Sequence, residues 1–398
     1  MGEGTVAWLL VSSALVLFMT PGLALFYGGM VRSKNVVNML VKNFITIGIV
    51  TVIWTLVGYS IAFGTDHGGL IGGFDFVGLA GVKGDALLFM VFQMMFAIIT
   101  PALISGAVAE RMKFSAWILF TTLWALLVYP VIAHWAFAAD GWLYAWGVRD
   151  FAGGLVVHIN AGIAALALIY ALGPRKGFGV EAIRPHSVPL TLLGTGILWF
   201  GWFGFNAGSA LAADGLAISA FVTTQIAASV GALAWVVAEW MKTGRPTAIG
   251  TASGAVAGLV AITPAAGFVS PMSAMAIGAL AGVLCFWAVS LKFRFGYDDS
   301  LDVVGVHLAG GIVGSVAVGL FAQASVNPAV PDGLLFGGFA FFGKQVAAVV
   351  VVMAVTFVAT YLLALFVKSV AGLRVDDEQE NNGLDISLHE ERGYVLTD

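Results

Sequence analysis

The chain has 398 residues, of which 60% are hydrophobic and only 10% charged, whereas soluble domains usually carry about 25% charged residues. With a mean hydropathy of +0.97, this composition indicates a protein embedded in lipid. The net charge of −4 is small and no basic block occurs, which excludes a nucleic-acid-binding protein. The single cysteine, Cys285, lies in an apolar run and allows neither an intrachain disulfide nor a thiolate metal cluster.

Apolar runs follow one another along the whole chain. A membrane-spanning helix needs about 20 mostly apolar residues, because the hydrocarbon core is roughly 30 Å thick. The first run has no basic leading segment, so it is interpreted as a span and not as a signal peptide. The sequence predicts an all-α polytopic membrane protein with eleven transmembrane helices. The runs lie near residues 6–30, 43–64, 86–109, 115–137, 151–172, 188–211, 217–241, 248–268, 273–291, 302–323 and 338–367.

The basic residues of the connections predict the orientation. Of the 18 Lys and Arg residues, only Lys83, Arg149 and Lys344 fall in one set of connections. The others, including Lys42, fall in the opposite set or in the C-terminal tail. By the positive-inside rule, the N-terminus lies outside the cell membrane and the C-terminus lies in the cytoplasm. The polar residues 368–398 are predicted to form a cytoplasmic tail.

Two short sequence matches indicate an internal duplication. One pairs Val157–Ala164 with Val306–Val313, and the other repeats Ile-Thr-Pro-Ala at Ile99–Ala102 and Ile262–Ala265. An odd number of spans fits two inverted five-helix repeats followed by one extra helix, as in many transporters. The predicted repeats cover about 6–172 and 188–323, the extra helix covers 338–367, and the transmembrane domain covers 1–367.

Two histidines are the main functional candidates inside the spans, where an ionisable group costs about 2.5–3.5 kcal/mol or more. His158 and His307 occupy matching places in the two repeats and would meet near the middle of the membrane. There they could share a proton and offer donor and acceptor nitrogens to a small polar solute. Alternatively, each bonds a neighbouring carbonyl and only packs. A zinc site fits poorly because zinc usually takes four ligands, so no metal is predicted.

Aromatic side chains gather at the predicted outer ends of three runs. They lie at Phe92–Phe96, Phe137 and Trp199–Ser209. A cation under ring faces gains about 0.5–2 kcal/mol, which indicates an outer aromatic vestibule for a small ammonium ion. The alternative is an interfacial aromatic belt. Asp150, at the start of the fifth run, either caps the helix or adds a negative field for the cation, and both interpretations stay open.

Sequence motifs that resemble those of a known family are spread over essentially the whole chain. They lie at Pro21–Met30, Lys34–Val36, Ala109–Arg111, Asp150–His158, Trp202–Ser209 and Asp298–Gly311, and in the tail at Gly372–Arg374, Glu378, Gly383–Asp385 and His389. Through them the chain resembles the Amt/Mep/Rh ammonium transporter family, of the bacterial and archaeal Amt type. Two departures occur: Phe137 aligns where the family usually has Trp, and Glu390 follows the tail histidine where the family usually has Gly.

The resemblance implies a homotrimer of eleven-helix protomers, each with its own pore. It also implies a role for individual residues. The residues implied in recruitment of ammonium are Phe96, Phe137, Ser209 and Asp150. Those implied in the gate are Phe96 and Phe205, and those implied in lining the pore are His158, His307, Trp202 and Phe26. Because Phe is a weaker cation–π partner than Trp, recruitment through Phe137 is expected to be looser.

The tail and the loop 173–179 resemble the surface that PII-type signal proteins block. The residues implied in this regulation are Arg175, Lys176, Arg374, Asp385 and His389. The alternative for a charged tail is plain solvation.

The expected function is selective transport of ammonium or ammonia without a cofactor, and not an enzymatic reaction. Neutral NH3 crosses an apolar constriction far more cheaply than NH4+, so the ion should lose its proton near the gate. We favour net movement of NH4+. Three alternatives remain: an ammonium sensor that signals through a partner with little flux, a membrane-embedded enzyme, and a conduit for another small neutral molecule such as CO2 or water.

Overall fold

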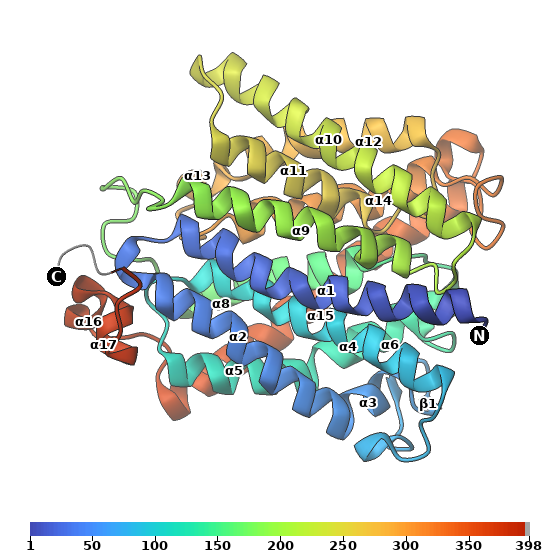
Figure 1. Cartoon of the computed structure of the whole chain (residues 1–398), viewed down its shortest axis with the longest axis horizontal. Coiled ribbons are helices and arrows are strands. Elements are labelled where there is room, and N and C mark those ends of the chain that lie inside the picture. Colours follow the sequence, from blue (N-terminus) through green and yellow to red (C-terminus); the bar gives the residue numbers. More distant parts are fainter. Residues whose placement is uncertain (395–398) are drawn as a thin grey trace.

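The protein, seen here as a computed structural model, is described over residues 1–394 and is mostly helical (Figure 1). In this part of the chain, ten helical segments are long and apolar enough to cross a membrane. An eleventh apolar helix, α11 (Ala248–Ile262), has 15 residues and coincides with the predicted run at 248–268. The predicted all-α polytopic fold is therefore confirmed, with ten full-length spans and one shorter one.

The helices follow the predicted runs in chain order. The first half contains α1 (Glu3–Met30), α2 (Val36–Ile53), α3 (Tyr59–Phe63), α4 (Asp85–Ile104), α5 (Phe114–Leu127), α6 (Tyr129–Phe137), α7 (Trp142–Trp146) and α8 (Asn160–Leu172). The second half contains α9 (Val188–Gly208), α10 (Gly215–Thr243), α11, α12 (Pro271–Ala288), α13 (Leu291–Phe295) and α14 (Ala309–Phe321). The last helices are α15 (Phe339–Ala371), α16 (Asp377–Asn382) and α17 (Leu384–His389).

The bundle has two distinct ends. The tail end carries α16 and α17, on the left in Figure 1. The hairpin end, on the right, carries the N-terminus and a short antiparallel hairpin of β1 (Asp66–His67) and β2 (Ile71–Gly72), in which Asp66 pairs with Gly72. These two names are used below without reference to a side of the membrane.

Helices α1 and α9 lie side by side along much of their lengths (Figure 1). Glycines make this close approach possible. A Cβ on Gly194 would lie 2.3 Å from the backbone nitrogen of Phe26, and one on Gly201 would lie 2.2 Å from Cγ of Met19. The glycines that form this seam are Gly22, Gly29, Gly194, Gly201, Gly204 and Gly208. Small residues at a helix interface are the usual means of tight packing in membranes, where lipid provides little hydrophobic drive.

The assignment of Lys42 to a connection is wrong. Helix α2 begins at Val36, seven residues before the predicted run, and Lys42 lies fully buried inside it. Its ammonium group donates to the carbonyl oxygen of Met112 at 3.1 Å, in the connection before α5. The long aliphatic stem of lysine lets the charged group reach a carbonyl while the stem stays in apolar surroundings.

Two other boundaries differ from the prediction. The run at 115–137 contains two helices, α5 and α6, that meet at Val128, because Pro130 lies in the first turn of α6 and cannot donate a backbone hydrogen bond to α5. Helix α15 continues to Ala371, four residues beyond the predicted end of the extra helix at 367, and is capped by Gly372 with a φ of +68°.

Candidate functional site

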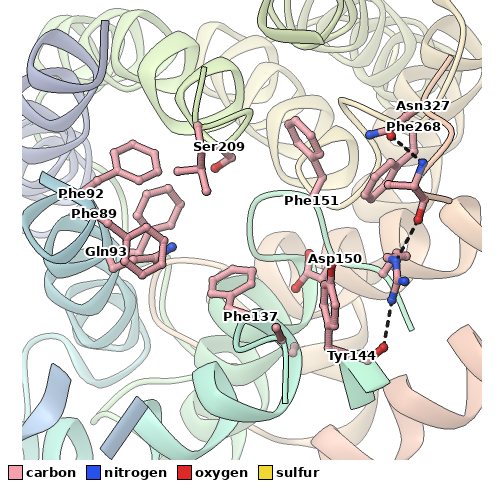
Figure 2. Close-up of a pocket in the computed structure, with 16 residues that line it drawn as sticks. Phe89, Phe92, Gln93, Phe137, Tyr144, Asp150, Phe151, Ser209, Phe268 and Asn327 are labelled. Carbon is pink, nitrogen blue, oxygen red and sulfur yellow. Dashed lines mark hydrogen bonds between the residues drawn. The ribbon is translucent and has the colours of Figure 1, made fainter. Parts of the chain in front are cut away.

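The helices enclose an open cavity of about 270 Å³ at the hairpin end, which we call the hairpin-end pocket. The four residues predicted to recruit substrate all line it: Phe96, Phe137, Ser209 and Asp150. In Figure 2, Ser209 lies across the pocket from Phe137 and Asp150. Four segments that are distant in sequence therefore meet at one pocket. The remaining lining residues are Phe89, Phe92, Gln93, Ala136, Ala139, Tyr144, Arg149, Phe151, Leu211, Phe268, Asn327 and Ala329.

Several lining residues were not predicted as site residues. Phe89 lies one to two turns before Phe96 on α4, and Phe268 and Asn327 lie in connections of the second half. Tyr144 lies in α7 and Arg149 just after it. No periodicity marks side chains in connections, so only the folded chain shows that they face the same space.

The carboxylate of Asp150 caps the start of the fifth span. Its Oδ1 accepts from the backbone N–H of Gly153 and Gly154 at 3.0 and 2.6 Å. Its Oδ2 accepts from Leu155 and Val156 at 2.8 and 3.2 Å. Gly153 has a φ of +122°, a conformation that glycine adopts without a Cβ clash. The capping interpretation of Asp150 is therefore present in the structure, and the residue also lines the pocket.

Two phenylalanine rings in tilted contact lie between the hairpin-end pocket and a deeper cavity. The ring centroids of Phe96 and Phe205 lie 4.3 Å apart at an interplanar angle of 42°. Phe96 lines the outer of the two cavities and Phe205 the deeper one. Phe92 packs edge-on against Phe96 with centroids 4.9 Å apart. The two residues predicted to form the gate are thus in contact, each lining one of the two cavities.

The deeper cavity is narrow, with a volume of about 10 Å³. A cavity needs roughly 10–15 Å³ on this measure to hold one water molecule. All four predicted pore residues, Phe26, His158, Trp202 and His307, line it. Every other lining residue is apolar: Met19, Leu23, Ile99, Leu103, Val157, Leu198, Phe205 and Val256. The two imidazoles are therefore the polar side chains facing this space, together with the indole of Trp202.

His158 and His307 contact each other directly. Their Nδ1 atoms are 3.3 Å apart, so one nitrogen donates and the other accepts. The rings are nearly parallel, at 18°, and the ring of His158 also stacks on Trp202 with centroids 5.5 Å apart. The buried Nε2 of His158 has no protein partner within residues 1–394. The alternative in which each histidine only bonds a neighbouring carbonyl does not describe His158, which faces the cavity with a free nitrogen.

The helix segments that carry the histidines are matched. His158 lies in the π-helical segment η5 (Gly154–Ile159), and His307 lies in the π-helical segment η6 (Val304–Leu308). Each segment packs on a glycine four residues beyond the other histidine. A Cβ on Gly162 would lie 2.5 Å from the backbone nitrogen of Leu308, and one on Gly311 would lie 3.1 Å from Cβ of His158. The contact is reciprocal, as a duplicated sequence predicts.

Asp299 is a counterpart of Asp150 that the sequence reasoning missed. It lies eight residues before His307, and its carboxylate accepts from the backbone N–H of Val303 and Val304 at 3.1 and 2.7 Å. Burial raises the pKa of this carboxyl to about 6. Asp302, which stands nearer to His307 in sequence, instead pairs with Lys292 at 2.5 Å. The equal eight-residue spacing, visible in the sequence, would have identified Asp299.

The repeated Ile-Thr-Pro-Ala motif shows the same matched geometry. Thr100 donates to the carbonyl of Phe96 at 2.7 Å, and Thr263 donates to the carbonyl of Leu259 at 2.8 Å. Thr263 also accepts the indole N–H of Trp202 at 2.8 Å. This hydrogen bond holds the indole against the ring of His158, so the motif contacts Phe96 in one half and Trp202 in the other.

Charged side chains form a buried cluster at the tail end. The guanidinium of Arg175 bonds both carboxylate oxygens of Asp298 at 2.8 Å and lies 3.2 Å from Glu110. Glu110 also pairs with Arg32 at 2.9 Å, and Arg111 lies 3.7 Å from Asp298. Although burial opposes it, these cations hold the pKa of Glu110 and of Asp298 below its usual value. Arg175 is thus buried within this cluster.

The tail is docked against this cluster. The backbone of Leu373 to Val375 pairs with Arg111 to Lys113, through a Lys113 N–H to Leu373 bond of 2.9 Å and a Val375 N–H to Arg111 bond of 3.1 Å. Arg374 and Lys176 both bind Glu380: the Arg374 guanidinium lies 2.6 Å from one carboxylate oxygen, and the Lys176 backbone N–H lies 2.8 Å from the other.

Two further predicted tail residues contact α2. Asp385 accepts from the backbone N–H of Val37 and Asn38 at 3.0 and 2.8 Å, at the start of that helix. His389 Nε2 lies 2.9 Å from the side-chain amide of Asn38. The five predicted regulatory residues therefore all belong to one tail-end contact region. Glu390, the residue that follows, has a φ of +56°, a conformation that glycine adopts more easily.

Comparison with known proteins extends these observations. The sequence profile of the Ammonium Transporter Family matches residues 7–394. An ammonium transporter of Mycobacterium tuberculosis is 50% identical over an alignment 430 positions long, which covers 98% of this chain and 90% of that protein. The crystal structure of Saccharomyces cerevisiae Mep2 superposes with a TM-score of 0.88 at 36% identity, covering 94% and 91% of the two chains. A structure titled Sensor Amt Protein superposes with a TM-score of 0.90 at 31% identity, covering 97% and 98%.

Proposed function

The chain belongs to the ammonium transporter family, and we propose that it conducts ammonium selectively across the cell membrane through the pocket, gate and cavity described above. The observation that carries the proposal is their arrangement in series. An aromatic pocket opens at the hairpin end, the Phe96 and Phe205 rings close its floor, and two histidines line the narrow cavity beyond. This order suits a small cation that must shed water before it passes.

The hairpin-end pocket would receive NH4+ first. Ring faces of Phe96 and Phe137 attract a cation, and the hydroxyl of Ser209 can accept a hydrogen bond from it. Ser209 donates its own proton to the carbonyl of Phe205 at 2.8 Å, which leaves its lone pairs for the ligand. The buried carboxylate of Asp150 would support this site through its fixed position and its field.

The gate and cavity would then impose deprotonation. An ammonium ion in an apolar space of about 10 Å³ loses its hydration without gaining a counter-ion, so desolvation lowers its pKa and favours NH3 plus a proton. The free Nε2 of His158 and the contact between the two Nδ1 atoms provide sites for that proton and for a neutral guest. Potassium has no proton to lose, which gives selectivity without discrimination by size. We favour separate passage of the proton, which makes the net species NH4+.

The decisive experiment is electrical. Purified protein in liposomes on a solid-supported membrane is pulsed with ammonium and then with potassium. A transient current for ammonium alone is expected, and a current of equal size for potassium would refute selective ammonium transport. If neither cation gives a current, the internal pH of the same liposomes distinguishes electroneutral ammonia conduction, which alkalinises the interior, from absence of transport.

We further propose that the hairpin end faces outward, that the tail end is cytoplasmic, and that three protomers assemble. The support for the orientation is the distribution of Lys and Arg, since only Lys83, Arg149 and Lys344 were assigned to the hairpin-end side. Lys83 and Arg149 lie in connections there, and Lys344 lies near the start of α15. Single-cysteine variants Lys83→Cys and Arg245→Cys can be labelled from outside intact cells. We expect Lys83→Cys to react, and a reaction of Arg245→Cys alone would contradict the proposed orientation. Mass determination of the detergent-solubilised protein tests the trimer.

A PII-type signal protein is the proposed regulator at the tail end. The support is that loop 173–179 and the tail form one continuous contact region, held by Lys176, Arg374 and Glu380. A pull-down with a PII-type protein at varied ATP and 2-oxoglutarate should show nucleotide-dependent binding. Absence of binding in every state would exclude this regulator.

Sensing is the second candidate function, because one of the matched structures is titled a sensor. A sensor would bind ammonium at the same pocket and pass little flux. The liposome measurement separates the two, since a sensor would give a binding signal that saturates with ammonium while the internal pH stays constant.

A further inference from the structure

Arg149 is a charged side chain of the hairpin-end pocket to which the proposed function gives no role. It lines the pocket next to Asp150. A fixed positive charge on the wall of a site for a cation opposes binding, because like charges repel even in a water-exposed pocket. Its presence there requires an explanation from its contacts.

The guanidinium of Arg149 binds neutral acceptors. Its Nε donates to the carbonyl of Ala329 at 3.2 Å, and its NH1 donates to the carbonyls of Tyr144 and Val148 at 3.0 and 2.8 Å. Within residues 1–394, no carboxylate lies within 4.0 Å of it. These carbonyls fix the side chain on the pocket wall, and its full charge remains.

The neighbouring Asp150 does not neutralise Arg149. The two oxygens of that carboxylate accept four backbone N–H groups at the start of the fifth span, and the residue is only 8% exposed. An anion held in this way interacts first with the dipoles that bind it. An incoming cation therefore meets a guanidinium that has no carboxylate partner, beside a carboxylate that is held by backbone N–H groups.

Arg149 also occupies an aromatic surface. Its Cζ lies 4.3 Å from the centroid of the Tyr144 ring, and Tyr144 lines the same pocket. A ring face that already carries a guanidinium is not available to an ammonium ion. The side chain thus opposes cation binding in two ways, by repulsion and by filling one of the faces that would attract the ligand.

We propose that Arg149 is an affinity-setting residue that weakens the binding of ammonium in the hairpin-end pocket. This inference rests on the proposed function and adds a residue to it. A pocket lined by so many rings would otherwise hold the cation strongly, and strong binding before the gate slows onward movement. The guanidinium of Arg149 lowers the affinity of the pocket for cations, and its hydrogen bonds to backbone carbonyls hold the pocket wall in place.

The test compares the apparent KM for ammonium in liposomes for wild type, Arg149→Gln and Arg149→Lys, each at low and high ionic strength. Neutralisation in Arg149→Gln is expected to lower KM on the order of two- to tenfold at low ionic strength. Salt screens the repulsion, so the KM of the wild type should fall as ionic strength rises, while that of Arg149→Gln should not. Arg149→Lys keeps the charge and should keep this salt dependence. Arg149→Met serves as a second neutral variant if Arg149→Gln does not insert.

Lys344→Gln is the matched control. It removes another hairpin-end positive charge, whose Nζ donates to the carbonyl of Trp146 at 2.8 Å outside the pocket lining. Its KM should change far less than that of Arg149→Gln. Equal KM values in wild type and Arg149→Gln, or equal shifts in the Gln and Lys variants, would overturn the proposal while leaving ammonium transport intact. Absence of any ammonium response in wild type would instead refute the proposed function, and the role of Arg149 with it.

Discussion

Asp299 stands to His307 as Asp150 stands to His158: each aspartate lies eight residues before its histidine and caps the π-helical segment that carries it. The two histidines that meet at 3.3 Å are therefore each positioned by a buried carboxylate. The caps differ in strength, because Asp150 accepts four backbone N–H groups and Asp299 accepts two.

Asp150→Asn should destabilise the protein more than Asp299→Asn. An amide has one acceptor oxygen in place of two, so at least two of the four buried N–H groups at Asp150 lose their acceptor, at about 1–3 kcal/mol each. Thermal unfolding in detergent measures the difference. Asp140→Asn, at an exposed position, is the control and should not shift the midpoint. Equal midpoints for Asp150→Asn and wild type would show that the cap contributes nothing.

Replacing both histidines by leucine should abolish the ammonium current. The double variant removes the polar groups that face the deeper cavity and leaves an apolar space without a site for a proton. Solid-supported-membrane recording gives the readout, and unfolding midpoints confirm that the variant is folded. If the double variant kept the full ammonium current and still gave no current with potassium, the histidines would not carry the charge.

Gly162→Ala should lower both stability and transport. Its Cβ would lie 2.5 Å from the backbone nitrogen of Leu308, next to His307, and backbone cannot move aside as a flexible side chain can. We expect a loss of about 1–3 kcal/mol and a displaced histidine pair. Gly48→Ala is the matched control, because no atom lies within 4 Å of its added Cβ on helix α2. If the two variants behave alike, the close approach at Gly162 is not needed.

Glu390→Gly should strengthen the docking of the tail. Glu390 closes α17 with a φ of +56°, and an L-residue in this conformation costs roughly 1 kcal/mol relative to glycine. The departure from the family pattern at this position therefore has a physical cost. Limited proteolysis of the tail should be slower in Glu390→Gly and unchanged in Glu391→Gly. Faster cleavage of Glu390→Gly would mean that added flexibility of the unfolded tail dominates.

The tail-end cluster should make the free energy of unfolding fall at acidic pH and leave it unchanged near neutral pH. The pKa values of Glu110 and Asp298 are lowered from 4.5 and 3.8, so the native state binds fewer protons than the unfolded chain. Their contribution is fully present above those values and is lost as pH falls through the lower, native values. Unfolding midpoints recorded from neutral to acidic pH should therefore decline at the acid end. Glu110→Gln should begin less stable and decline less steeply, and a parallel curve would argue against the assignment.

The sequence predicted the helices and the contact of His158 with His307 because both depend on patterns that can be recognised in the linear sequence. Apolar length marks a span, and the repeated Val-His marks the matched histidines. Lys42 was misplaced because a charged residue normally ends an apolar run, whereas here a carbonyl of Met112 accepts from it inside the bundle.

The remaining features depend on where connections fold. Asp299 caps η6, whereas Asp302, which has a φ of +63°, pairs with Lys292, and the spacing of Asp302 from His307 alone does not reveal this. Tyr144 lies in the five-residue helix α7 and Arg149 lies just after it, and in so short a segment neither spacing nor composition shows which side chains face a pocket. Their shared surface is a property of the tertiary structure alone.

The glycine seam between α1 and α9 restricts how this protein can open. Phe205 stands on α9 between Gly204 and Gly208, and a Cβ at either glycine would lie 2.7 Å from a side-chain carbon of Leu15 or Ser12 on α1. Sliding α9 along α1 would push these closely packed atoms into each other, whereas rotation of the Phe205 side chain leaves the two backbones where they are. We therefore expect that, if the Phe96 and Phe205 rings open, they do so by side-chain rotation within a fixed frame of helices.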